Sequence, residues 1–244
     1  MSTPLRPEPV HDFGGKLRQP ALFGGVLDYV AWQRAVRAAR ARGEAPPPMP
    51  PVGPFSVNLD LTTACNYRCD HCIDWDILNT KHRHDEETLR SSIIEMVERG
   101  LRSAILIGGG EPTIYPGFVD FVRFLKDLEL QVAVVSNGSR GDKLLEIADV
   151  LEERDWLRLS LDAGSNELFR SMHKPVKKSL TLDEICAWIP RIKQRNPRFQ
   201  IGFSYIIVWQ GASRDDVAIH ENIHEIVMAT QRAKDYGFDY ISLK

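Results

Sequence analysis

The chain has 244 residues, 43% of them hydrophobic and 26% charged, an ordinary composition for a globular protein of one large domain or at most two. Its formal net charge of -2 argues against nucleic-acid binding as its main purpose, and no apolar run approaches the length of a membrane span. The first residues, MSTPLRPEPV, lack the basic-then-apolar pattern of a secretory signal, so we expect a cytoplasmic protein with reduced cysteines.

Residues 1–53 differ in pattern from the rest of the chain. A helix is predicted from Leu27 to Gly43, and the proline run from Pro46 to Pro54 predicts a stiff, extended connector. Three arginines recur at a spacing of three along this helix: Arg34, Arg37 and Arg40. A solvated helix face is the simpler interpretation of them, and a docking stripe for a partner protein is the alternative. We therefore divide the chain into an N-terminal helix and connector, 1–53, and a core domain, 54–244.

In the core domain, short β-rich runs alternate with amphipathic helical stretches. Six strands are predicted, at residues 55–62, 103–109, 131–138, 157–162, 200–209 and 239–244. Helix signals lie between them: a start at Asp85, apolar stripes at 118–125 and 144–151, a capping box at 181–184 and a similar pattern at 222–225. This alternation predicts an α/β fold of parallel βα units that curl into a partial TIM-like barrel. The sequence stops on the sixth strand, so either the partial barrel is the whole design or further C-terminal residues belong to it.

Polar or glycine-rich clusters follow four of the predicted strands. The first is followed by three cysteines and the second by GGGEP (108–112), while the third ends on SNG (136–138) and the fourth ends on SLDAG (160–164). The carboxyl ends of parallel strands meet at one rim of a barrel, which is where function collects. The four clusters therefore predict one site at this rim.

The cysteines form a C-x3-C-x2-C pattern: Cys65, Cys69 and Cys72. Structural zinc needs four ligands, and a disulfide framework needs an even number of cysteines. Three thiolates can hold three irons of a four-iron, four-sulfur cube and leave the fourth iron open to chelate a small molecule. The zinc alternative requires a fourth ligand, for which His71, His82, His84 and Cys186 are the candidates.

The other clusters offer groups that suit a small polar ligand. Gly108 to Gly110 allow close backbone approach or unusual dihedral angles, and Glu111 adds a carboxylate that can pair with a ligand ammonium. Hydroxyl and carboxylate partners for ribose or an amino-acid group come from Ser136, Ser160 and Asp162.

C-x3-C-x2-C after the first strand, followed by a GGEP-type motif after the second, resembles the radical S-adenosylmethionine (SAM) superfamily over about residues 55–244. The resemblance implies a (β/α)6 partial barrel and a [4Fe-4S] cluster on Cys65, Cys69 and Cys72, whose open iron is chelated by the methionine end of SAM. It further implies which residues contact SAM. Gly109, Gly110 and Glu111 would meet the methionine amino group, and Ser160 and Asp162 would meet the ribose or methionine end, with Ser136 beside them. His71 would lie near adenine, which would also have apolar contacts from within 205–208. The methionine carboxylate would meet Arg170, His173 or Lys174, of which Lys174 is taken as the site residue.

The implied reaction is reductive cleavage of SAM to methionine and a 5'-deoxyadenosyl radical, which abstracts hydrogen from a substrate. We expect a small-metabolite substrate in natural-product or cofactor biosynthesis, a one-electron donor such as flavodoxin or ferredoxin, and no nucleic-acid or membrane partner. The SLDAG and GGGEP contexts resemble the group that contains the molybdenum-cofactor cyclase and the peptide-maturation enzymes. The alternatives are a glycyl-radical-type activase or peptide-modifying enzyme, and a non-catalytic scaffold stabilised by a metal.

Overall fold

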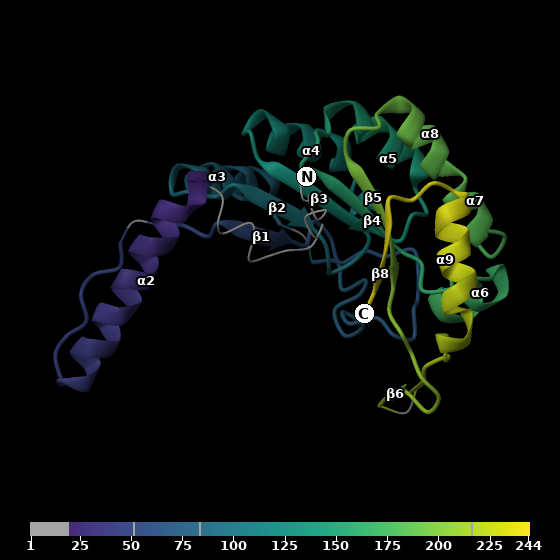
Figure 1. The fold of residues 1–244 in the computed structure, drawn as a ribbon, viewed down its shortest axis with the longest axis horizontal. Coiled ribbons are helices and arrows are strands. Elements are labelled where there is room, and N and C mark those ends of the chain that lie inside the picture. The colour runs from purple at the N-terminus through teal and green to yellow at the C-terminus, as the bar shows by residue number, and fades with distance from the viewer. Residues whose placement is uncertain (1–19, 51, 83, 216) are drawn as a thin grey trace, which may run out of the picture. The chain divides into compact units, whose positions relative to one another are not determined.

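The structure is a computed structural model that describes residues 20–50, 52–82, 84–215 and 217–244 (Figure 1). The chain divides into two compact units: one runs to Ser56 and includes Arg90–Arg102, and the other comprises Val57–Leu89 and Ser103–Lys244. The expected boundary near residue 54 lies close to this division, which also assigns most of one helix to the first unit. Expectations for residues 1–19 lie outside the described residues.

The first unit contains the long predicted helix. Helix α2 spans Pro20–Ala41, so it begins earlier than the Leu27 start that the sequence predicts. Gly43, with a φ of 71°, follows its end, and residues 44–50 form neither helix nor strand, as expected of the proline run. The Trp32 indole N–H donates to the Pro47 carbonyl at 3.1 Å, which fastens the connector to α2.

All six predicted core strands are present and form one sheet in the order β1-β2-β3-β4-β5-β8. Its strands are β1 (Ser56–Leu59), β2 (Ser103–Leu106), β3 (Gln131–Ser136), β4 (Trp156–Ser160), β5 (Gln200–Tyr205) and β8 (Tyr240–Leu243). The pairs from β2 through β5 to β8 are parallel, and the expected α/β partial barrel is confirmed. The fold therefore places the carboxyl ends of these strands at one rim.

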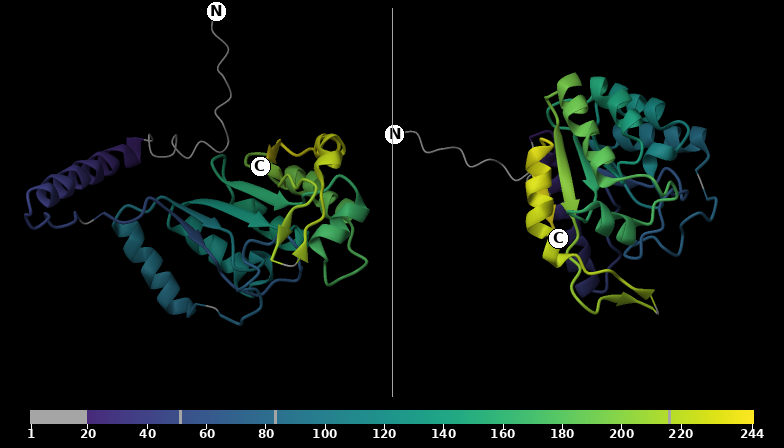
Figure 2. Two further views of the ribbon diagram at one scale, coloured as in Figure 1. Left: turned by 90° about the horizontal axis from the view of Figure 1, so that it is seen from below. Right: turned by 90° about the vertical axis from the view of Figure 1, so that its right-hand side faces the viewer.

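Helices follow the strands, and those of the second unit cover one face of the sheet (Figure 2). The helices are α3 (Glu86–Glu98), α4 (Phe118–Asp127), α5 (Gly141–Ile147), α6 (Asn166–His173), α7 (Leu182–Cys186), α8 (Trp188–Arg195) and α9 (Ile226–Asp235), with 3-10 turns η1 (Pro112–Ile114), η2 (Ala148–Val150) and η3 (Ile223–Glu225). Strand side chains on the covered face, such as Leu106, Val134 and Phe203, are fully buried. They pack with the apolar stripes that the sequence shows on α4 and α5, because burying both apolar surfaces removes them from water.

The opposite face of the sheet, called here the inner face, has an apolar base. Ile105, Ala133 and Trp156 lie in register on β2, β3 and β4 and form a buried cluster, against which Ile107 and Val135 pack. On β4 and β8 this face becomes polar toward the carboxyl rim, where Ser160 and Ser242 are half-buried.

Local capping signals are only partly confirmed. Asp85 accepts the Thr88 N–H at 2.9 Å before α3, and Thr181 with Glu184 forms the predicted capping box of α7. The cap predicted at 222–225 is wrong, because Asn222 makes no side-chain cap at η3.

Helix α6 and a short hairpin, β6 (Ser213–Arg214) with β7 (Val217–Ala218), have no counterpart among the predicted elements. No helix within the described ranges is both long and apolar enough to cross a membrane.

One buried ion pair supports the sheet at the end opposite the rim. Asp155 is 1% exposed and accepts the Val132 N–H at 2.6 Å and the Glu152 N–H at 2.8 Å. Its second oxygen lies 2.8 Å from the Lys126 ammonium. We expect Asp155→Asn to lower the free energy of unfolding in urea by about 2 kcal/mol, because the charged hydrogen bonds of a buried carboxylate are weakened while Lys126 keeps its second partner, the exposed Glu152.

The matched control is Asp120→Asn, which removes a 77% exposed carboxylate from its pairing with Arg123. Exposed pairs contribute little, so a loss below about 0.5 kcal/mol is expected there. Equal losses in the two variants would contradict the assigned role of Asp155.

Candidate cofactor site

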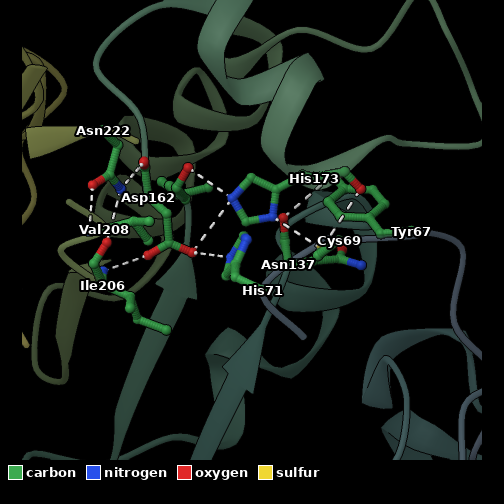
Figure 3. A network of polar contacts seen from close by, with 10 residues as sticks. Tyr67, Cys69, His71, Asn137, Asp162, His173, Ile206, Val208 and Asn222 are labelled. Carbon is green, nitrogen blue, oxygen red and sulfur yellow. Dashed lines mark hydrogen bonds and ion pairs between the residues drawn. The ribbon is translucent and has the colours of Figure 1, made fainter. Parts of the chain in front are cut away.

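The predicted site clusters meet at the carboxyl rim of the sheet. Figure 3 shows a polar network that joins the cysteine loop after β1 to segments that follow β3, β4 and β5. Its members come from distant parts of the chain: Tyr67, Cys69, His71, Asn137, Asp162, His173, Ile206, Val208 and Asn222. The single site that the sequence predicts at this rim is therefore consistent with the fold.

The three loop cysteines are half-buried free thiols. Burial raises the pKa of Cys65 to about 11, with the nearby charges of Glu111 and Cys72 adding to the shift. Burial likewise raises the pKa values of Cys69 and Cys72. Thiolates at these positions need a compensating cation, and metal binding would supply one by displacing the protons.

The spacing of the donor atoms distinguishes a single ion from a cluster. Among the described residues, one set of three has all its donor atoms within 4.8 Å of one another, namely Cys69, His71 and His173; the three cysteines do not form such a set. A single zinc ion, with Zn–S bonds of about 2.3 Å, needs its ligands close together, whereas a multinuclear cluster accepts wider spacing. The three cysteines are therefore not arranged around one position, whereas Cys69 and the two histidines are.

The glycine turn after β2 packs directly on the backbone that precedes the first cysteine. A Cβ on Gly110 would lie 2.0 Å from the Ala64 carbonyl oxygen, and Gly109 has a φ of 62° with its hypothetical Cβ 3.0 Å from the Thr62 carbonyl. The Glu111 N–H also donates to the Ala64 carbonyl at 2.9 Å. Glycines are needed here because no side chain fits between the two backbones. The turn thereby positions Cys65.

Glu111 is buried and fastens the ends of β2 and β3 to each other. Its carboxylate accepts the Ser136 hydroxyl and the Asn137 N–H, each at 2.7 Å, and the Thr113 N–H at 3.0 Å. Burial raises its pKa, and these hydrogen bonds oppose that shift. Glu111 and Ser136 are thus hydrogen-bonded to each other in this structure. Their predicted contacts with SAM stay predictions.

Asp162 lies at the centre of the network in Figure 3. It is fully buried, and its oxygens accept the His71 Nε2–H at 3.1 Å and the Ile206 N–H at 2.6 Å. The other ring nitrogen of His71, Nδ1, is buried and has no hydrogen-bond partner within the described part of the chain. Buried polar atoms are nearly always satisfied. The unpaired Nδ1 therefore indicates that His71 faces a position for a bound group.

His173 is a site neighbour that the sequence nominated only as one of three basic candidates. Burial lowers its pKa to about 4, so the ring is neutral at pH 7. Nε2 lies 2.9 Å from the Leu161 carbonyl and so carries the proton, and Nδ1 lies 3.2 Å from Cys69 Sγ. The sequence signal was its place among the basic residues after the fourth strand, and it did not indicate the contact with Cys69.

Lys174 takes part in a different contact from the expected one. Its ammonium donates to the buried carboxylate of Asp70 at 2.6 Å, which ties the cysteine loop to the end of α6. Ser160 ends β4 and is half-buried at the rim. The expected SAM contacts of Lys174 and Ser160 stay predictions.

Two further residues of the site lie in segments whose role the sequence did not show. Arg214, on β6, donates to the Cys72 carbonyl at 2.7 Å, and its guanidinium carbon lies 4.8 Å from the Trp75 ring centroid. Asn222 donates to the carbonyls of Asp162 and Ile206, each at 2.8 Å. These contacts hold the cysteine loop and the segment after β5 at the same rim.

The close fit of the glycine turn generates a test. Gly110→Ala would drive a Cβ into the backbone of Ala64, and neither backbone can move without shifting Cys65. We expect a loss of about 3 kcal/mol in the free energy of unfolding and a lower iron content after reconstitution with iron and sulfide. Gly24→Ala in α2 is the control, since nothing lies within 4 Å of its Cβ. Full iron loading of Gly110→Ala would refute the role given to the turn.

Known proteins resemble this chain in sequence and in fold. Residues 59–223 match the family model described as the radical SAM superfamily. An S-adenosylmethionine-dependent nucleotide dehydratase of Thermoplasmatales archaeon (strain ISO4-H5) is 32% identical over 110 residues, which are 44% of this chain and 38% of that protein. The protein of the same name from Selenomonas ruminantium is 24% identical over 178 residues, 69% of this chain and 62% of that protein. The chain thus spans less than two thirds of the length of these relatives.

Among solved structures, Streptococcus suis SuiB bound to its precursor peptide SuiA superposes with a TM-score of 0.64 at 12% identity, covering 86% of this chain and 42% of that one. At this identity the likeness shows the fold alone. Because the family model covers more than half of the sequence and includes all three cysteines, the chain belongs to the radical SAM superfamily.

Proposed function

We propose that the chain binds a [4Fe-4S] cluster through Cys65, Cys69 and Cys72 and uses it to cleave SAM reductively, giving a 5'-deoxyadenosyl radical that abstracts hydrogen from a small-metabolite substrate. The carrying observation is that three half-buried thiols in a C-x3-C-x2-C pattern share one loop at the carboxyl rim. A bound cluster supplies the electron for SAM cleavage and an open iron for the methionine end of SAM.

The residues of the chain hold this site in shape. The Asp70–Lys174 pair and the Arg214 contact to the Cys72 carbonyl fix the cysteine loop at two points. Asp162 orients His71, whose unpaired Nδ1 is positioned to accept a hydrogen bond from the cofactor.

A small metabolite is preferred to a peptide as the substrate. Two relatives are named nucleotide dehydratases, which favours a substrate of the nucleotide kind. The electron donor, a flavodoxin or ferredoxin, and the cytoplasmic location stay predictions.

The cluster assignment predicts which thiol is essential. The anaerobically reconstituted parent protein, reduced with dithionite and given SAM, should produce 5'-deoxyadenosine, measured by chromatography. Cys69→Ala should produce none, and Cys186→Ala should match the parent because its thiol lies in the core away from the loop. Production by Cys69→Ala, or a parent protein that holds zinc in place of iron, would rule out the proposal.

The position of His71 predicts a change in SAM affinity. Removing the ring in His71→Ala deletes one hydrogen-bonding group at the cofactor position, so the Kd for SAM should rise about tenfold. His84→Ala is the control because His84 is exposed. Calorimetric titration of both reconstituted variants measures the effect, and an unchanged Kd in His71→Ala would remove His71 from the cofactor site.

A further inference from the structure

The inner face of the sheet is built in layers along the strand direction. Above the apolar base formed with Trp156, the next register row carries Arg158 on β4, Gly202 on β5 and Tyr240 on β8. The row nearer the rim consists of three serines in register: Ser160, Ser204 and Ser242. Lys244 directly follows β8, so the polarity of this part of the inner face rises toward the rim.

Arg158 is buried without a partner for its charge. It is 9% exposed, and its Nε is a buried atom with no hydrogen bond to any described residue. Each buried acidic or histidine side chain of the described residues, by contrast, has a hydrogen-bond or ion-pair partner: Asp70, Glu111, Asp155, Asp162, His173 and Glu225. Arginine stays protonated in proteins, and a buried charge is costly unless it is paired.

The neighbours of Arg158 do not supply a negative charge. The Trp156 ring centroid lies 5.3 Å from its guanidinium carbon, a cation–π contact. Burial raises the pKa of Tyr240 to about 12, so that phenol is neutral at pH 7. A Cβ on Gly202 would lie 2.1 Å from the Tyr240 ring, so the absence of a side chain there lets the ring lie across β5 beside Arg158. The groups of this row that surround the Arg158 guanidinium are thus neutral, and the negative charge that acts on it is that of Asp162.

Lys244 adds a second cation at the same face. Strand alternation from Tyr240 and Ser242 puts residue 244 on this face, and its backbone hydrogen-bonds to Tyr205 and Ile207 at the end of β5. The Lys244 side chain is exposed; partial burial and then the positive charge of Arg158 lower its pKa. Asp162 is the acid whose charge reaches both cations. Its two oxygens, however, already accept hydrogen bonds from His71 and Ile206. Neither cation forms an ion pair with a described carboxylate, so the inner face has an excess of positive charge.

We propose that Arg158 and Lys244 bind an oxyanion of the substrate, a phosphate or a carboxylate, on the inner face of the sheet below the cofactor rim. The planar guanidinium can bind two oxygens of such a group at once, and the row of Ser160, Ser204 and Ser242 provides hydroxyl donors on its rim side. This inference rests on the proposed function, because it makes the oxyanion part of the molecule on which the radical acts.

The arrangement also orients the substrate. Arg158 lies two residues before Ser160 and four before Asp162 along one strand and its continuation. An anion held at Arg158 leaves the rest of the molecule directed toward the rim, where His71 and the cysteine loop lie. Arg158 and Lys244 are therefore positioning residues that also select for negatively charged substrates.

The test is calorimetric titration of the reconstituted full chain, without SAM, with ribose 5-phosphate in one arm and succinate in the other. The parent protein should bind one of the two anions saturably, and the arm that binds identifies phosphate or carboxylate as the group. Arg158→Met and Lys244→Met should each weaken that binding about tenfold or more, because each removes a charged partner. Lys178→Met, which removes an exposed lysine in the loop after α6, should bind as the parent does.

Three results would overturn the proposal: no saturable binding in either arm, equal binding by the parent and the two inner-face variants, or an equal loss in Lys178→Met. If Arg158→Met fails to fold, Lys244→Met decides, since Lys244 follows the last strand and is exposed. The heat of binding does not depend on SAM cleavage. Anion binding without 5'-deoxyadenosine production would therefore contradict the proposed function alone, and production without anion binding would contradict this inference alone.

Discussion

The fully buried carboxylate of Asp162 joins the segments that make up the rim. A carboxylate without exposure is tolerated only when its oxygens are paired, and here the partners come from the cysteine loop through His71 and from the end of β5 through Ile206. His173 Nε2 lies 3.4 Å from the same group and brings the end of α6 to it, while Asn222 binds the backbone carbonyl of Asp162. The positions of the cysteine loop and of the segment after β5 both depend on this residue.

The carboxyl rim and the inner face form one continuous arrangement. Trp156 and its apolar neighbours close the base of the inner face, Arg158 lies above them, and the serine row and Lys244 follow before the rim begins. The charge of Asp162 reaches Arg158 and Lys244 and thereby couples the two regions electrostatically. A cofactor at the rim and an anionic substrate below it would therefore meet near the end of β4.

Much of the fold could be predicted because it follows from local periodicity. Each βα unit shows its strand as a short β-rich run and its helix as an apolar stripe, and Thr181 with Glu184 forms a cap that needs only four consecutive residues. The cysteine spacing is local as well. By contrast, the strands of the β6–β7 hairpin contain two residues each, too few for any periodic pattern.

The missed parts of the site depend on contacts between distant residues. Asn222 precedes a turn and resembles a helix cap in sequence. Its side-chain amide instead accepts a hydrogen bond from the Val208 N–H and donates one to the Asp162 carbonyl, across the fold. His173 meets Cys69 although 104 positions separate them. Arg158 is one charged residue in a predicted strand, and only the structure shows that it is buried without a counter-ion. Sequence shows which groups are present, whereas pairing is decided by tertiary packing.

The proposed function requires that three thiolates of one loop hold a cluster and leave an iron free for SAM. Electron paramagnetic resonance of the anaerobically reconstituted, dithionite-reduced protein, recorded before and after SAM is added, tests this directly. We expect the signal of a reduced [4Fe-4S] cluster whose g values change when SAM is added, because SAM would become a ligand of the free iron. A cluster signal that SAM leaves unchanged, or a protein that binds zinc and gives no cluster signal, would contradict it.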